Sequence, residues 1–253
     1  MKTFYTILLI VLLPNIVIAQ TKTIHTFVAL CDNENQGIVP VPKSLGNGKD
    51  TKNNLYWGAA FGVKSFFKNK AENWKLVSTI TLNSSTILER LLFKHKTKDV
   101  YMLADAYDGE QIKICIEDFL KASNSQLPVT ITHNNQTLKF GGHANVTAYV
   151  GHDGLMDFKV SIDYNKSNTS KDVIILACYS KRFFSSEIKK SQANPVLWTT
   201  HLMAPEAYVL NAALNGWINN ESGTSIDERA AQAYNKYQKC GIKGARNLFT
   251  TGF

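Results

Sequence analysis

The sequence predicts an α/β protein whose mainly parallel sheet is flanked by helices on both faces. Short apolar runs of strand length alternate along the chain with segments whose apolar residues recur at helical spacing. Several of these runs are rich in Val, Ile and Leu, which is typical of parallel strands buried on both faces. No internal repeat, low-complexity tract or obvious linker interrupts the alternation, so we expect one domain.

The N-terminus has the features of a secretory signal peptide. Lys2 precedes an apolar run over residues 4–13, and small side chains lead up to a cleavage point after Ala19. This run is about ten residues long, whereas a spanning helix needs roughly 20. An uncleaved anchor is the alternative. We therefore expect a signal peptide over residues 1–19, a mature domain over residues 20–253, a secreted or periplasmic location and no integral membrane segment after cleavage.

The N-terminal part of the mature chain predicts strands and helices in turn. Residues 24–30 form a buried strand candidate, which a polar loop rich in Gly, Pro, Lys and Asn follows. Helical spacing predicts a helix over residues 53–68, and residues 75–80 predict a second strand. Residues 84–93, whose Ile and Leu recur with helical period, predict another helix, and residues 99–104 the next strand.

The middle of the chain predicts a core helix and a hairpin. Apolar residues between 112 and 119 mark one helix face, which places Cys115 in the core. Residues 129–140 alternate apolar and polar types around Asn134 and Asn135, the pattern of a β-hairpin. We expect this hairpin to be an excursion from the main sheet.

Four more strands are expected after the hairpin. Residues 146–150 predict one, residues 158–162 alternate like an edge strand, and residues 173–177 form the most apolar run of the chain. Residues 195–200 predict the last strand.

The C-terminal part is predicted to be helical. Apolar residues from 207 to 217 line one helix face just after Pro205. A capping box of Ser225 and Glu228 predicts the start of a final helix that closes near Cys240.

The net charge does not indicate a nucleic-acid partner. The chain has 28 basic and 20 acidic side chains, a formal charge of +8. A basic surface attracts nucleic acid, anionic lipid or cell wall. The lysines are scattered, however, and neither an arginine-rich stripe nor an aromatic RNA-binding motif is present. We interpret the charge as a solvated surface.

The cysteine count permits disulfides without requiring them. An even number of cysteines in an exported protein allows paired bridges, but a domain of this size buries enough core to fold without them. The four are Cys31, Cys115, Cys178 and Cys240.

The ends of two consecutive predicted strands carry His152 and Cys178. Ligands of open parallel sheets bind beyond the carboxyl ends of the strands. Cysteine chemistry needs a thiolate, a base and donors for an oxyanion. His152 and Cys178 supply the first two, and the backbone N–H groups of Gly154 and Cys178 are candidates for the third. The alternatives are an inert buried thiol or half-disulfide and a histidine that merely occupies a turn.

The residues around these two side chains resemble the caspase-like cysteine peptidases, the clan of caspases, legumains, gingipains and clostripain. In that clan an apolar strand ends in His followed by Gly, and the next ends in the nucleophilic Cys, often after Ala. Residues 147–154 read TAYVGHDG here, and residues 173–178 read VIILAC. The resemblance extends over residues 24–218 in element order, and it departs at Asp153, which separates His152 from the glycine.

The resemblance implies an endopeptidase with a His152 and Cys178 dyad, a peptide or protein substrate, and no cofactor or metal. An acidic Asp32 in its substrate pocket would favour Arg or Lys before the scissile bond. Alternatively, Asp32 caps the turn that follows it. By position the pocket includes Asp32, Asn33, Thr199, Thr200 and His201.

The other candidate motifs of the sequence do not indicate a different kind of functional site. Asp153 and Asp157 are candidates to orient His152 or are ordinary turn aspartates. The histidines lack zinc-site spacing, and no serine lies in a nucleophile elbow. Two further functions remain: a catalytically inactive caspase-like binding module of the cell envelope, and an envelope peptide hydrolase or transpeptidase.

Overall fold

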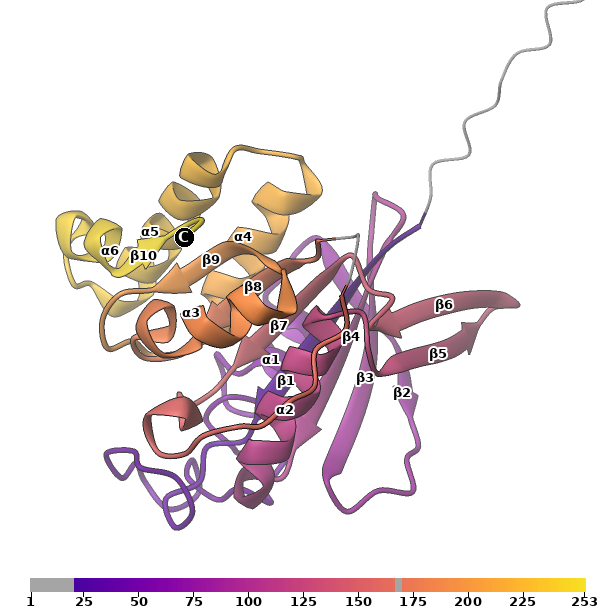
Figure 1. Ribbon diagram of the computed structural model, residues 1–253, viewed down its shortest axis with the longest axis horizontal. Coiled ribbons are helices and arrows are strands. Elements are labelled where there is room, and N and C mark those ends of the chain that lie inside the picture. Colours follow the sequence, from indigo (N-terminus) through magenta and orange to yellow (C-terminus); the bar gives the residue numbers. More distant parts are fainter. Residues whose placement is uncertain (1–20, 167–169) are drawn as a thin grey trace, which may run out of the picture.

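One eight-stranded sheet forms the centre of the protein. The computed structural model describes residues 21–166 and 170–253, so the predicted signal peptide lies outside the described residues. The strand order is β10-β9-β8-β7-β1-β4-β3-β2, and the strands from β9 to β4 run parallel. Both ends of the sheet are antiparallel, which confirms the predicted α/β class with a mainly parallel sheet (Figure 1). The strands are β1 (Lys22–Ala29), β2 (Trp74–Ile80), β3 (Ile87–His95), β4 (Val100–Tyr107), β7 (Val146–Val150), β8 (Asp172–Leu176), β9 (Asn194–Thr199) and β10 (Phe249–Thr250).

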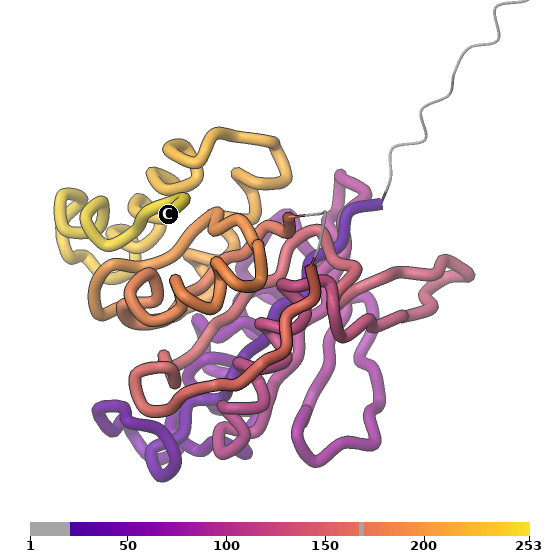
Figure 2. The backbone as a smooth tube through the Cα atoms, viewed as in Figure 1, coloured from indigo at the N-terminus to yellow at the C-terminus, as the bar shows by residue number. Residues whose placement is uncertain are grey.

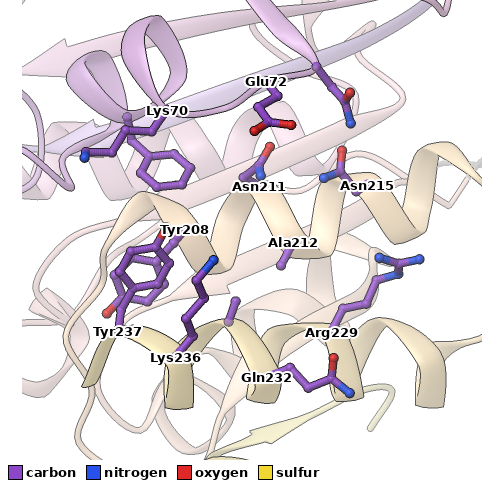
Figure 3. A pocket seen from close by; sticks show the side chains of 13 residues that line it. Lys70, Glu72, Tyr208, Asn211, Ala212, Asn215, Arg229, Gln232, Lys236 and Tyr237 are labelled. Atoms are coloured by element: carbon purple, nitrogen blue, oxygen red, sulfur yellow. The ribbon is translucent and has the colours of Figure 1, made fainter. Parts of the chain in front are cut away.

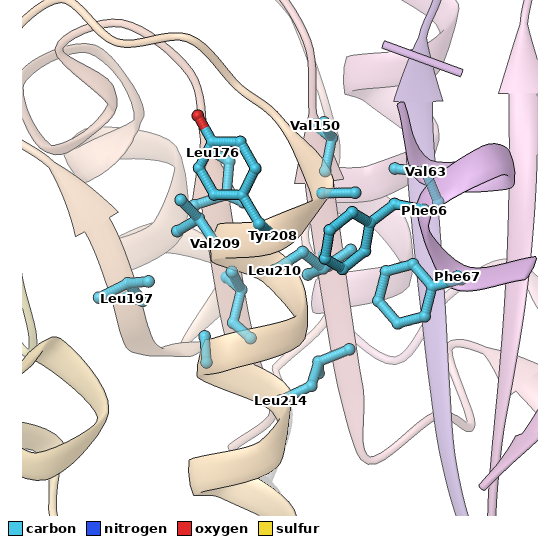
Figure 4. Packing of buried hydrophobic residues seen from close by; sticks show 14 of the residues in the cluster. Val63, Phe66, Phe67, Val150, Leu176, Leu197, Tyr208, Val209, Leu210 and Leu214 are labelled. Carbon is cyan, nitrogen blue, oxygen red and sulfur yellow. The ribbon is translucent and has the colours of Figure 1, made fainter. Parts of the chain in front are cut away.

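Helices cover both faces of this sheet. On one face α2 and α3 pack around Phe119 and Phe184. On the other face α1, α4 and α5 pack around Phe67 and Leu210 (Figure 4). None of the helices in the described part of the chain combines the length and hydropathy that crossing a bilayer requires. The helices are α1 (Val63–Asn69), α2 (Ile112–Ser123), α3 (Ser180–Ser191), α4 (Ala207–Ile218), α5 (Gly223–Gln238) and α6 (Ile242–Leu248).

Strand β8 shows why the central strands are almost entirely apolar. Ile174 and Leu176 belong to the core under α4, whereas Val173 and Ile175 belong to the core under α2 and α3. Because helices cover both faces, the side chain at each of these positions is buried. Burial of each such apolar side chain stabilises the fold by about 2 kcal/mol.

The predicted hairpin is confirmed. Strands β5 (Pro128–His133) and β6 (Gln136–Gly141) form a separate two-stranded sheet that projects from the body of the molecule (Figure 2). Asn134 and Asn135 have φ of 49° and 61°, the left-handed values that a two-residue hairpin turn requires and that Asn tolerates.

The helix predicted over residues 84–93 is wrong, because residues 87–93 belong to strand β3. It pairs antiparallel with β2 and β4. Leu91 and Phe93 enter the core under α1, while Leu92 enters a small core beneath the hairpin. Apolar residues are therefore buried on both faces of the strand, and their density resembles a helical period.

Two other predicted elements differ from the structure. Residues 53–62 form turns, and helix α1 begins only at Val63. The buried side chain of Asn54 accepts from the N–H of Cys31 and donates to its carbonyl, which ties these turns to the end of β1. Residues 158–162 form no strand; their alternate side chains pack on the α2 core without a ladder partner.

The C-terminal helices also correct the prediction. Ser222, rather than Ser225, caps α5, because its hydroxyl accepts from the Ser225 N–H at 3.2 Å. Lys239 ends α5 in the left-handed region, and the separate helix α6 follows. Helix α3 was not predicted either.

Candidate functional site

His152 and Cys178 leave the sheet from neighbouring strands at the same level. Strands β7 and β8 run parallel with Val150 opposite Leu176, and each candidate residue follows two positions later. The Gly151 N–H continues the ladder to the Leu176 carbonyl at 3.2 Å. Since paired strands lie about 4.8 Å apart, the two side chains start from adjacent backbone positions at the carboxyl edge.

A carboxylate holds the imidazole of His152. The ring is buried, and its Nε2 lies 2.6 Å from Oδ2 of Asp157. The Tyr149 hydroxyl donates to the His152 carbonyl at 2.7 Å, which fixes the backbone beneath the ring. Because Asp157 occupies Nε2, Nδ1 is the nitrogen left for a second partner.

Cys178 differs from the two core cysteines in its exposure. All four cysteines are free thiols, and Cys31 and Cys115 are buried, whereas Cys178 is partly exposed. Its Sγ donates to the Met203 carbonyl at 3.5 Å and accepts from the Met203 N–H at 3.4 Å. Burial raises the pKa of the Cys178 thiol, the Met203 backbone opposes this, and the charge of Asp153 adds to it. Partial burial therefore disfavours the thiolate of Cys178 in this arrangement.

The turn after Cys178 is tightly held. Tyr179 has φ of 50° and ψ of 29°, a conformation that costs a residue with a Cβ about 1–2 kcal/mol. Its N–H donates to the His201 carbonyl at 2.9 Å, and the Ser180 hydroxyl donates to the Ile175 carbonyl at 3.0 Å. Helix α3 starts immediately afterwards, so the positive end of its dipole lies next to Cys178 and favours a thiolate there.

Asp153 is buried with one oxygen unused. Its Oδ1 accepts from the Leu155 N–H at 3.1 Å, but Oδ2 has no hydrogen-bond partner among the described residues. Burial raises the pKa of Asp153 to about 7, and the nearby charge of Asp157 adds to this shift. Of the two aspartates weighed as partners for His152, Asp157 makes the contact.

The backbone N–H of Gly154 already donates a hydrogen bond within its own turn. Its N–H donates to the His152 carbonyl at 3.0 Å, within the turn that leads into a short 3-10 helix over Gly154–Met156. An oxyanion would have to displace this bond to reach the Gly154 N–H.

Asp32 and Asn33 stabilise their own loop. Oδ1 of Asp32 accepts from the backbone N–H groups of Glu34 and Asn35, as expected for a turn cap. The Asn33 side chain bonds both backbone groups of Val41. Both residues line a cavity of about 410 Å³ whose lining includes neither His152 nor Cys178.

Thr199, which ends β9, supports the fold, whereas the two residues after it lie toward the surface. The buried Thr199 hydroxyl donates to the Ala177 carbonyl and accepts from the Ser180 N–H, so it supports the turn beneath Cys178. The Thr200 hydroxyl donates to the Asn247 carbonyl at 2.7 Å. His201 is exposed and lines a separate cavity of about 370 Å³.

Within the described ranges, no group of three or more His, Cys, Asp or Glu side chains forms a metal site. No protein-family model matches the chain, and no curated protein or solved structure matches it significantly.

Proposed function

We propose that this protein is an exported cysteine peptidase in which Cys178 is the nucleophile and His152 the general base. The parallel register of β7 and β8 supports the proposal, because it ends both strands at one level, two residues before His152 and Cys178. Asp157 on Nε2 of His152 gives the base the orienting partner that such sites require.

In this mechanism Cys178 exchanges its contact with Met203 for one with His152. The thiol proton passes to Nδ1, and Sγ attacks the peptide carbonyl to form a tetrahedral intermediate. The imidazolium then returns the proton to the departing amine, leaving a thioester. His152 next takes a proton from water, which attacks the thioester and releases the acid product and the thiol. The backbone N–H of Cys178 is the candidate donor to the developing oxyanion, because the Tyr179 and Ser180 N–H groups already donate to the His201 carbonyl and the Thr199 hydroxyl.

Cleavage after basic residues is a finer part of the proposal. Acidic side chains line the cavity beyond β1, among them Asp32 and Glu110, but Lys49 pairs with Glu110 there at 3.1 Å. Fluorogenic peptides ending in Arg, Asn or Asp test this part separately, and turnover only after Asp would contradict it.

A binding module without catalysis is the second candidate. The observation in its favour is that both hydrogen bonds of the Cys178 thiol go to the Met203 backbone. A module of this kind would leave Cys178 unreactive.

The decisive experiment compares Cys178→Ala and His152→Ala with the wild type on a fluorogenic peptide panel. We expect Cys178→Ala to abolish turnover and His152→Ala to reduce it by roughly 10²–10⁴-fold. Cys240→Ala is the matched control, since Cys240 is an exposed free thiol and its removal should leave turnover unchanged.

Thiol reactivity gives a second measurement that needs no substrate. If His152 accepts the thiol proton as proposed, this transfer offsets the burial that raises the pKa of Cys178, and iodoacetamide at neutral pH should modify Cys178 faster than Cys240, as read by mass spectrometry. Equal rates, or full activity in Cys178→Ala, would overturn the peptidase proposal. Export is tested independently by sequencing the mature N-terminus, which should begin at Gln20.

A further inference from the structure

The loop after β1 connects a cavity with the candidate site. A cavity of about 410 Å³ between α4 and α5 lies elsewhere, and none of its described lining residues belongs to that site (Figure 3). The cavity beyond β1, also of about 410 Å³, is lined mainly by residues 32–35 and 46–49 of the loop that follows β1. At Gly37 this loop contacts Asp157, the partner of His152. The contact therefore joins the loop to the base of the site.

The backbone of Gly37 lies directly against the carboxylate of Asp157. The Gly37 N–H donates to Oδ2 of Asp157 at 3.3 Å, and the same oxygen lies 2.6 Å from Nε2 of His152. A Cβ added to Gly37 would lie 2.7 Å from Oδ1 and 3.0 Å from Oδ2 of Asp157. Such a close approach of backbone and carboxylate requires a residue without a side chain. Glycine at this position therefore leaves the carboxylate room to bind the imidazole.

Gln36 holds this part of the loop in place. Its side chain is buried, and all three of its hydrogen bonds go to main-chain groups. Nε2 donates to the carbonyls of Leu30 at 2.7 Å and Gly109 at 3.0 Å, and Oε1 accepts from the Asp32 N–H at 3.3 Å. Moving this amide would leave polar groups unpaired in the interior, which is costly. Gly37 is thus attached to a fixed point of the fold.

We propose that Gly37 is a positioning residue for His152. It holds the carboxylate of Asp157 against Nε2, so the ring proton stays on Nε2 and Nδ1 keeps the lone pair that accepts the thiol proton. Asp157 needs this contact because its side chain is 39% exposed, and exposed side chains exchange rapidly between rotamers. The expected effect on turnover rests on the peptidase proposal, whereas the effect on the ring of His152 does not.

Nitrogen NMR of the histidine rings in the full mature chain tests this role without a substrate. His152→Ala assigns the ring signals of His152, and Asp157→Ala shows the ring without its carboxylate partner. In Gly37→Ala the new Cβ displaces the carboxylate, so we expect the His152 ring shifts to move most of the way to their values in Asp157→Ala. Gly244→Ala is the matched control. Gly244 is an exposed residue of α6 whose added Cβ meets no atom within 4 Å, and its replacement should leave the shifts unchanged.

Turnover of the peptide that the wild type cleaves fastest is the second readout. We expect Gly37→Ala to lower kcat by roughly 10–100-fold with little change in KM, because the base is misplaced while the substrate contacts remain. In an Asp157→Ala background the same substitution should cause no further loss, because the carboxylate through which it acts is gone.

Two results would overturn the role of Gly37. One is a Gly37→Ala variant whose His152 ring shifts equal those of the wild type, even with a lowered melting temperature, since a purely structural loop contact gives that result. The other is an equal loss of kcat with and without Asp157. A wild type that turns over no peptide would overturn the peptidase proposal instead, and the ring shifts alone would then decide the role of Gly37.

Discussion

The carboxyl group of Asp153 couples the stability of the fold to pH. Its pKa is raised from an ordinary value near 4 to about 7 by burial, so the folded protein holds this proton more tightly than the unfolded chain. The stability that this group contributes is therefore fully present below about pH 4 and is lost as pH rises through about 7.

Asp153→Asn should remove this dependence. We expect the variant to match the wild type near pH 4 and to exceed it above pH 7, by an upper bound on the order of 4 kcal/mol in free energy of unfolding. Urea titrations between pH 4 and 8 measure the difference. A difference that does not change with pH would show that Asp153 does not titrate in this range.

The sequence predicted which residues lie at the strand ends better than it predicted their hydrogen-bond partners. His152 and Cys178 were found because apolar runs reveal where buried strands end. Asp157 was one of two aspartates named as candidate partners of His152, and it makes the contact. Met203 was not predicted as a partner of Cys178, because it reaches the thiol from the loop after β9. For Asp32, the hydrogen bonds correspond to the turn-capping alternative.

The β5–β6 hairpin depends on two left-handed residues at its tip. Asn135→Gly should keep or slightly raise stability, because glycine adopts positive φ without strain. Asn135→Val should lower it by about 1–2 kcal/mol, since a branched Cβ is disfavoured there. Thermal unfolding of the two variants measures this. Equal melting temperatures would mean that the tip relaxes to another turn.

Helices and strands that a local sequence pattern specifies were predicted correctly. Those that depend on contacts with distant parts of the chain were not. Asn134 and Asn135 indicate their turn directly, and the run 173–177 indicates a buried strand. Strand β3 was mistaken for a helix because burial on its two faces comes from α1 and the hairpin. Residues 158–162 have real alternation, but no neighbouring strand supplies hydrogen bonds to complete a ladder.

The two larger cores of the described chain lie on opposite faces of the eight-stranded sheet. Phe119 centres the core beneath α2, with Phe27, Tyr149 and Phe184 at ring distances of 6.1, 5.8 and 6.2 Å. Phe184 lies on α3, but Phe27 and Tyr149 lie on β1 and β7, strands whose other side chains form the opposite core, so loss of packing on one face destabilises both faces.

Phe119→Ala should cost about 3–5 kcal/mol and should lower the denaturation midpoint of both faces together. Ile114→Ala, on the exposed side of the same helix, should change stability by about 0.5 kcal/mol or less. Urea unfolding followed by tryptophan fluorescence and by circular dichroism measures this. Two separate transitions in Phe119→Ala would indicate that the faces unfold independently.

Strand β1 also determines how the molecule can be attached to a surface. It is 8 residues long, starts at Lys22, pairs in parallel with β7 from Ile24 to Val28, and ends near the level of His152 and Cys178. Its first residue is therefore roughly 25 Å from the carboxyl edge. A tether joined at Thr21 would hold the protein by the far rim of its sheet and leave the edge that carries the thiol facing outward, within reach of large polypeptides.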